Sequence, residues 1–229
     1  MARVHGFDRR RHTRVKLPPS VVTPLFPQLK YNQISLPVID VSIGGARIDD
    51  ANENLTGEVG HLVRMDLCWP NEFETLDVRV IAASCATNRH LNFQNLSPGS
   101  LARLSMIVRH GSAGQKLRLV TAPKGGPVQL HSAELWTGIN GDSLAFFDNS
   151  DKIALFTACA TTIVFGADGP PRTLLNPSGS ESRPAHSVEL ADALVVLVNI
   201  PRPTARLLSL IRQLTTQTHL WSKTGSGGA

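Results

Sequence analysis

The chain is poor in cysteine, in aromatic residues and in long apolar runs, and each shortage excludes a class of protein. Its 229 residues include three cysteines, an odd number with no close pair: Cys68, Cys85 and Cys159. We therefore expect reduced, small apolar side chains and no disulfide framework. The most apolar run, Ile153 to Phe165, is too short to cross a bilayer and contains several threonines. Arginines follow the N-terminus where a signal peptide would be apolar, so the sequence predicts a soluble, cytoplasmic protein.

Sequence patterns of the common enzyme classes are missing as well. The chain has no Gly-x-Ser-x-Gly elbow, no phosphate loop of the Gly-x-x-x-x-Gly-Lys type and no dinucleotide glycine fingerprint. Its eight histidines never fall at metal-ligand spacing with one another or with cysteine. We therefore expect no enzyme activity, no metal site and no cofactor.

Positive charge is concentrated at the start of the chain. The formal net charge is +5, and the opening segment alone holds six basic residues against the single acid Asp8: Arg3, Arg9, Arg10, Arg11, Arg14 and Lys16. Such a cluster attracts an anion, which would be a nucleotide, a nucleic acid or a lipid surface. Arg10 and Arg14 are four residues apart, so a helix or a strand would place them on roughly one side. Two guanidinium groups there would grip phosphates or the O6/N7 edge of guanine.

A second polar pattern lies between Val38 and Ile48. Apolar and polar residues nearly alternate from Val38 to Ile43, so a strand would direct Asp40 and Ser42 to the face opposite Ile39, Val41 and Ile43. Gly44 and Gly45 follow at once, where the backbone can take unusual dihedrals or let a ligand come close. A carboxylate and a hydroxyl beside exposed backbone can accept hydrogen bonds from a ligand's donors and can form a binding site for a phosphate.

These two patterns together resemble the PilZ family, a group of bacterial second-messenger receptors. The family's Arg-x-x-x-Arg arm is matched by Arg10 and Arg14, and its Asp/Asn-x-Ser-x-x-Gly motif by Asp40, Ser42 and Gly45. The resemblance covers roughly residues 8–109 and implies a six-stranded antiparallel β-barrel with a closing helix that binds cyclic di-GMP.

The resemblance also implies the ligand contacts. Arg10 and Arg14 would hold phosphates and guanine edges, Asp40 would accept from guanine N–H groups, and Ser42 with the backbone at Gly44 and Gly45 would complete the floor. A basic residue before the arginine pair, here Arg9, implies an intercalated dimer of the ligand. Each hairpin residue also has a structural alternative: a turn-capping carboxylate at Asp40, a hydroxyl bonded to its own strand at Ser42, and a simple bulge at the two glycines.

The remaining patterns predict the elements of two domains. In the first half we expect strands over Tyr31–Ile43 (interrupted at Pro37), Val63–Trp69, Leu76–Ala82 and Asn88–Phe93, and a helix that begins at Ser97-Pro98 and ends at Gly111. The predicted divisions are a flexible basic arm over 1–15, a barrel over 16–112, an α+β region over 115–221 and a disordered tail over 222–229.

The topology of the second half is left open by the sequence. Strands are expected at Lys116–Thr121, Val128–Trp136, Leu144–Phe147 and Ile153–Phe165, followed by an exposed mobile loop over Gly169–Ser187. Val188–Ile200 fits helix or strand, and a clearer helix begins at Pro203-Thr204. A degenerate duplicate of the barrel is one alternative for this half.

The resemblance to the PilZ family implies the function of a cyclic di-GMP receptor. Ligand would draw the arm across the barrel, change the orientation of the domains and signal to a protein partner that controls motility, adhesion or exopolysaccharide. Whether the chain forms a homodimer is left open. One alternative is a nucleic-acid or other anion binder that uses the basic arm, although an aromatic content of 5% gives a base-stacking platform little support. The other is a degenerate PilZ interaction module without a ligand.

Overall fold

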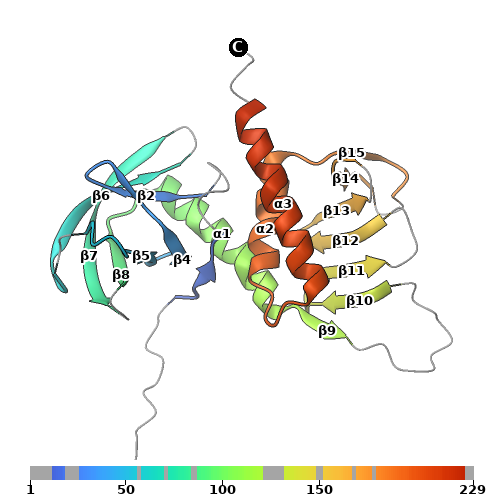
Figure 1. Ribbon diagram of the computed structural model, residues 1–229, viewed down its shortest axis with the longest axis horizontal. Helices are drawn as coiled ribbons and strands as arrows, with labels where there is room; N and C mark the ends of the chain where they lie inside the picture. Colours follow the sequence, from blue (N-terminus) through green and yellow to red (C-terminus); the bar gives the residue numbers. More distant parts are fainter. Residues whose placement is uncertain are drawn as a thin grey trace, which may run out of the picture.

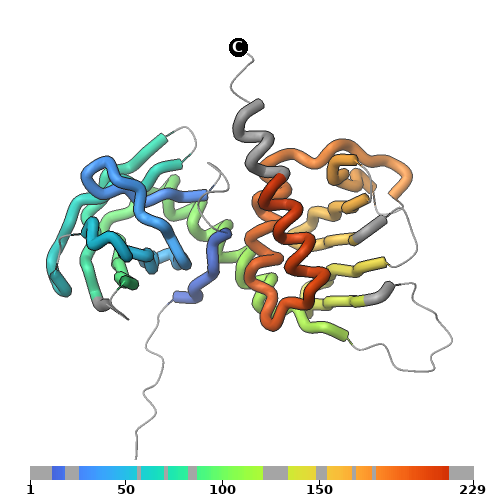
Figure 2. Tube along the Cα trace, viewed as in Figure 1, coloured from blue at the N-terminus to red at the C-terminus, as the bar shows by residue number. Residues whose placement is uncertain are grey.

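The computed structural model shows two antiparallel sheets joined by a central group of helices (Figure 1). It describes residues 12–18, 26–55, 58–69, 72–83, 87–120, 132–147, 152–166, 169–176 and 179–224. Figure 2 follows the same path along the Cα trace, from the first sheet through the long connecting helix to the second sheet. Among the described residues, no helix combines the length and the apolar character needed to span a membrane.

The first sheet is curled like half a barrel and contains eight strands. They are β1 (Val15–Lys16), β2 (Gln28–Tyr31), β3 (Ile34–Leu36), β4 (Val38–Ser42), β5 (Gly45–Asp49), β6 (Leu62–Cys68), β7 (Phe73–Ala83) and β8 (Asn88–Gln94). Their order is β1-β4-β5-β8-β7-β6-β2-β3. The expected count of six strands is therefore not matched. The end of the basic arm adds β1 beside β4, and the short β3 adds a strand at the opposite edge, separated from β4 by Pro37.

The interior of the first half follows the predicted alternation in β6 and β7 but not in β4. Met65 and Val78 are almost completely buried while their chain neighbours point outward. In β4 the register shifts between Val38 and Asp40, and a bulge of this kind displaces the alternation by one residue. Val38 therefore joins Val41 in the core in place of Ile39, and the prediction that Ile39 and Val41 share one face of the strand is wrong.

Helix α1 (Pro98–Lys116) connects the two halves. Its start is confirmed, because the Ser97 hydroxyl accepts a hydrogen bond of 3.2 Å from the backbone N–H of Ser100. The prediction that Gly111 ends the helix is wrong. A Cβ atom at Gly111 would lie 2.4 Å from Cβ of Val15, and one at Gly114 would lie 2.0 Å from the backbone oxygen of Val196. Both glycines thus let neighbouring elements approach an unbroken helix, and the chain changes from one sheet to the other after α1.

The second half is a meander of seven strands with two helices. The strands are β9 (Arg118–Val120), β10 (Ser132–Thr137), β11 (Ser143–Phe147), β12 (Lys152–Ala158), β13 (Thr161–Gly166), β14 (Arg172–Leu174) and β15 (Ser182–Pro184). They lie in sequential order across the sheet, in contrast to the first sheet. Helices α2 (Ser187–Val198) and α3 (Ala205–Thr224) lie between this sheet and α1 (Figure 1).

Three expectations for this half are corrected or decided. Residues 153–165 form a hairpin, not one strand, because Cys159 and Ala160 turn the chain with φ of 52° and 68°. The stretch 169–187, expected as a mobile loop, contains β14 and β15. The ambiguous stretch 188–200 is helix α2, which is apolar on nearly all sides because it packs against α1, α3 and β12 at once.

Candidate anion-binding site

A row of polar side chains crosses four neighbouring strands of the first sheet. Lys16 on β1 lies opposite Asp40 on β4, Asp40 lies opposite Arg47 on β5, and Arg47 lies opposite His90 on β8. Directly opposed residues share a face of the sheet, so all four side chains project to the same side. There they line a pocket of about 410 Å³, within the usual range for small-molecule sites, together with Arg14, Gln115 and residues 198–203.

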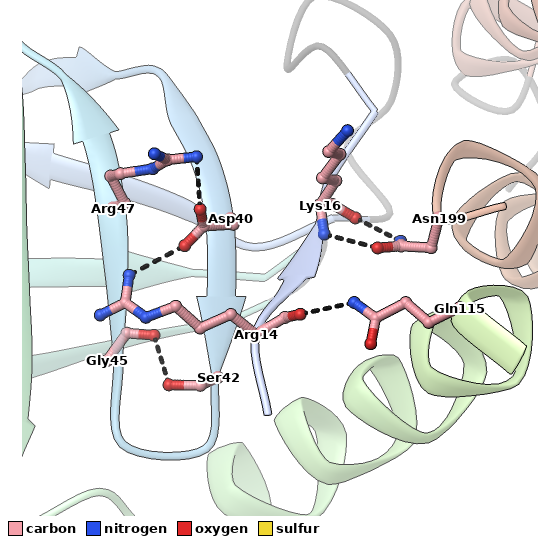
Figure 3. A network of polar contacts seen from close by, with 8 residues as sticks. All are labelled: Arg14, Lys16, Asp40, Ser42, Gly45, Arg47, Gln115 and Asn199. Atoms are coloured by element: carbon pink, nitrogen blue, oxygen red, sulfur yellow. Dashed lines mark hydrogen bonds and ion pairs between the residues drawn. The ribbon is translucent and has the colours of Figure 1, made fainter. Parts of the chain in front are cut away.

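Asp40 is held between two arginines at this pocket. Nη1 of Arg14 lies 2.9 Å from its Oδ1 and Nη2 of Arg47 lies 2.7 Å from its Oδ2 (Figure 3). Asp40 is only 6% exposed, and a buried carboxylate requires such charged partners. The structural alternative of a turn-capping carboxylate does not describe this residue, since both oxygens face guanidinium groups. The second arginine of the arm and the acid of the hairpin motif are therefore in direct contact.

Ser42 and the two glycines have mainly local contacts. The Ser42 hydroxyl donates a 3.3 Å hydrogen bond to the backbone oxygen of Gly45, which is the structural alternative for this residue. A Cβ at Gly45 would lie 2.0 Å from the backbone oxygen of Leu91, and one at Gly44 would lie 2.7 Å from the His12 imidazole. Close packing against the backbone of β8 thus requires glycine at 45, whereas at 44 the exposed His12 side chain could move aside, and neither glycine has a positive φ.

The end of the basic arm is attached to both halves of the molecule. The backbone N–H of Leu17 donates to the oxygen of Ile39 at 3.2 Å, which continues the pairing of β1 with β4. On the other side, Nε2 of Gln115 donates to the backbone oxygen of Arg14 at 2.7 Å (Figure 3). Val15 is completely buried, so the last residues of the arm are held by packing as well as by hydrogen bonds. Arg9 and Arg10, the other predicted arm residues, lie outside the described part of the chain.

The charge of the pocket favours an anion. Four permanent cations, Arg14, Lys16, Arg47 and Arg202, line it against the single carboxylate of Asp40. Nε of Arg47 is buried and has no hydrogen-bond partner among the described residues. Converging cations in a partly enclosed pocket raise the local concentration of negatively charged ligands. No group of metal-ligating side chains occurs among the residues that the structure describes.

Sequence reasoning missed several residues of this pocket. Arg47 could have been found, because a hairpin that turns at Ile43-Gly44 places residue 47 opposite residue 40. Gln115 was hidden by the expectation that the helix ended at Gly111. Asn199 and Arg202 lie far along the sequence from the arm, and no local pattern connects them to it.

Comparison with known proteins finds partial structural likeness only. No family model matches the chain, and no curated protein matches it. Similar solved structures include an uncharacterized Legionella protein, with 17% identity over 42% of this chain and 89% of that chain at a TM-score of 0.29. Two others are YcgR of Escherichia coli in complex with c-di-GMP (21% identity, 44% of each chain, TM-score 0.32) and the PilZ domain of YcgR with c-di-GMP (18% identity, 44% of this chain and 88% of that chain, TM-score 0.32).

Proposed function

We propose that the chain is a cyclic di-GMP receptor whose ligand binds at the pocket around Asp40. The observation that carries this proposal is the Arg14–Asp40–Arg47 cluster, where the arginine arm and the Asp-x-Ser-x-x-Gly hairpin meet in a pocket with an excess of positive charge.

The chemistry of the cluster suits this ligand. Cyclic di-GMP carries two phosphodiester groups, and guanidinium groups bind phosphate with paired charge-assisted hydrogen bonds. Its guanines present O6 and N7, which accept hydrogen bonds from arginine. Their N–H groups can donate hydrogen bonds to a carboxylate. Arg10 and Arg14 are proposed to hold phosphates and guanine edges, and Asp40 to accept from guanine. Ser42, whose proton is directed to Gly45, would offer a lone pair, and the backbone at Gly44 would complete the floor.

Binding at this site is an exchange of partners. In the structure each oxygen of Asp40 contacts one arginine. A guanine edge that takes over one oxygen would release Arg14 for a phosphate, so that the carboxylate and the guanidinium both stay paired. Each charge-assisted hydrogen bond contributes roughly 1.5–3 kcal/mol. Four or five of them would supply about the 8 kcal/mol of a micromolar complex after ordering costs.

The proposed action is a switch and not catalysis. Ligand would neutralise the basic residues that precede β1 and draw them over the pocket, and the arm's contact with α1 would pass the change to the second half. A protein partner in motility, adhesion or exopolysaccharide control would read that change. Hydrogen exchange should therefore show added protection of residues 8–14, which precede β1, when ligand is added, and unchanged exchange there would contradict the switch.

Isothermal titration calorimetry of the full chain tests the binding itself. We expect saturable binding of cyclic di-GMP, weak or no binding of GTP and of a short DNA duplex, and at least tenfold weaker cyclic di-GMP binding for Arg14→Ala. Arg64→Ala is the matched control, because Arg64 is 83% exposed and pairs only loosely with Asp77 at 3.5 Å. Equal affinity for all three ligands, with a steep dependence on salt, would support a nonspecific nucleic-acid binder instead.

The stoichiometry is a separate prediction. Arg9 before the arginine pair leads us to expect two nucleotides per chain. Saturation at one nucleotide per chain would refute the intercalated dimer and leave the receptor proposal standing.

A further inference from the structure

The turn between α2 and α3, residues 199–203, forms the wall of the pocket that faces the first sheet. We call it the bridging turn. Its first residue, Asn199, ends α2 and is 6% exposed. The Asn199 amide accepts a hydrogen bond from the backbone N–H of Lys16 and donates one to the backbone oxygen of the same residue, both at 2.9 Å (Figure 3). The side chain thus pairs with β1 as a neighbouring strand would, and it fixes the bridging turn one strand away from Asp40.

Asn199 is itself fixed from the helix side. Its amide also donates to the backbone oxygen of Val195 at 2.9 Å, and its Nδ2 would lie 3.1 Å from a Cβ atom at Gly111. The amide therefore forms three hydrogen bonds, two to the arm at Lys16 and one within its own helix. The position of the bridging turn relative to the arm is set by these contacts.

Arg202 is the unusual residue of the bridging turn. It adopts a φ of 55°, a left-handed conformation that is unfavourable for a long side chain with a Cβ atom. Pro201 and Pro203 on either side restrict the backbone, so the chain has few ways to relieve it. A strained conformation that persists in a pocket wall is typical of functional positions.

The guanidinium of Arg202 also lacks a partner. It is exposed and forms no ion pair or hydrogen bond with any residue in the described ranges, although it lines the same pocket as Arg14, Arg47 and Asp40. Asp40 does not pair with it, since its two oxygens contact Arg14 and Arg47. Among the described residues that line the pocket, Asp40 is the one carboxylate, so Arg202 lies beside the pocket without an acidic partner there.

We propose that Arg202 binds a phosphate group of the ligand, so that the site is shared between the two halves of the chain. This inference depends on the proposed function for the identity of the ligand, but not for the presence of an anion. The first half contributes Arg14 and Arg47, and the second half contributes Arg202 across the pocket. A bound phosphate therefore holds the bridging turn to the first sheet, and Asn199 acts as a positioning residue that keeps Arg202 within reach.

The test compares variants that lose the same charge. Arg202→Gln should weaken cyclic di-GMP binding about tenfold, as expected for the loss of one charge-assisted contact. Arg212→Gln is the control, because Arg212 is exposed on α3 and does not line the pocket. Arg202→Gly should weaken binding as much as Arg202→Gln while leaving the melting temperature unchanged or raised, since glycine accepts a positive φ without strain. Loss of affinity without loss of stability separates a ligand contact from a structural role.

The outcomes separate this inference from the proposed function. If wild type binds cyclic di-GMP and Arg202→Gln binds it as tightly as Arg212→Gln does, the shared site is overturned and the receptor proposal stands. In a second outcome, the wild type fails to bind cyclic di-GMP but binds inorganic pyrophosphate. If Arg202→Gln then weakens pyrophosphate binding and Arg212→Gln does not, the receptor proposal fails and the shared anion site stands. If wild type binds neither ligand, both are overturned.

Discussion

The contact between α1 and α2 supports the sharpest stability prediction, which is that Gly114→Ala loosens the two halves from each other. Gly114 is buried in α1, and an added Cβ would lie 2.0 Å from the backbone oxygen of Val196 and 3.2 Å from Cβ of Asn199. Real Cβ atoms essentially never approach closer than 3.0 Å, so α2 must retreat by about 1 Å. The obstacle is backbone and not the end of a flexible side chain, so rotamer changes cannot relieve it.

The expected size follows from two opposing effects. Forcing an extra methyl group into a packed contact costs roughly 1–3 kcal/mol, and a backbone clash belongs at the upper end of that range. Alanine regains about 1 kcal/mol over glycine within a helix. We therefore expect a net loss of about 2 kcal/mol in the free energy of unfolding, which lowers the melting temperature by roughly 4–8 °C for a chain of this size.

Thermal unfolding followed by circular dichroism measures this loss, with Gly99→Ala as the matched control. Gly99 is in the first turn of the same helix, and the nearest atom to its added Cβ is Oγ of Ser97 at 3.9 Å. Gly99→Ala should therefore leave the stability unchanged or raise it by at most about 1 kcal/mol. Because Asn199 moves with α2, Gly114→Ala should also weaken cyclic di-GMP binding. A Gly114→Ala protein that is as stable as Gly99→Ala would refute the close approach of the two helices.

Three further predictions concern single residues. Arg47→Gln removes one of the two guanidinium groups on the buried carboxylate and should weaken cyclic di-GMP binding at least tenfold, whereas Arg64→Gln on an exposed strand position should not, as measured by calorimetry. Gly45→Ala places a Cβ 2.0 Å from the backbone oxygen of the neighbouring strand and should lower the free energy of unfolding by about 1–3 kcal/mol in urea denaturation; wild-type stability would contradict the packing. Hydrogen bonds from Arg183 lower the pKa of Glu189 from 4.5 to about 2. The ionised Glu189 side chain therefore stabilises the folded chain fully above about pH 4.5, and this stabilisation is lost as the pH falls toward 2. Glu189→Gln should therefore flatten the dependence of stability on pH across this window, and an unchanged slope would disprove the assignment.

The sequence predicted those parts of the fold in which a local pattern decides the structure and no contact with a distant element overrides it. The alternation in β6 and β7 and the cap at Ser97 each depend on neighbours within a few residues. The two motifs predicted that Arg14 and Asp40 contact one ligand, and the structure places these side chains 2.9 Å from each other. The predicted roles toward a ligand remain predictions for all seven site residues: Arg9, Arg10, Arg14, Asp40, Ser42, Gly44 and Gly45.

The errors occurred where distant packing decides the local structure. In the sequence, Gly111 resembles a helix end. In the structure β1 packs directly against it, and only a residue without a Cβ atom leaves room for that contact in a continuous helix. Cys159 and Ala160 form a turn without any of the residues that usually mark one. The bulge in β4 moved Val38 into the core. Asn199 pairs with Lys16 across 183 residues of sequence, so only the folded chain shows that the second half reaches the pocket.

A crystal structure of the full chain grown with cyclic di-GMP tests the central claim most directly. We expect nucleotide in the pocket between β4 and the bridging turn, with a guanine edge at the Asp40 carboxylate and phosphate within hydrogen-bond distance of Arg14 and Arg202. Nucleotide bound at another surface, with the ion pairs of Asp40 to Arg14 and Arg47 intact and the pocket without ligand, would contradict the account.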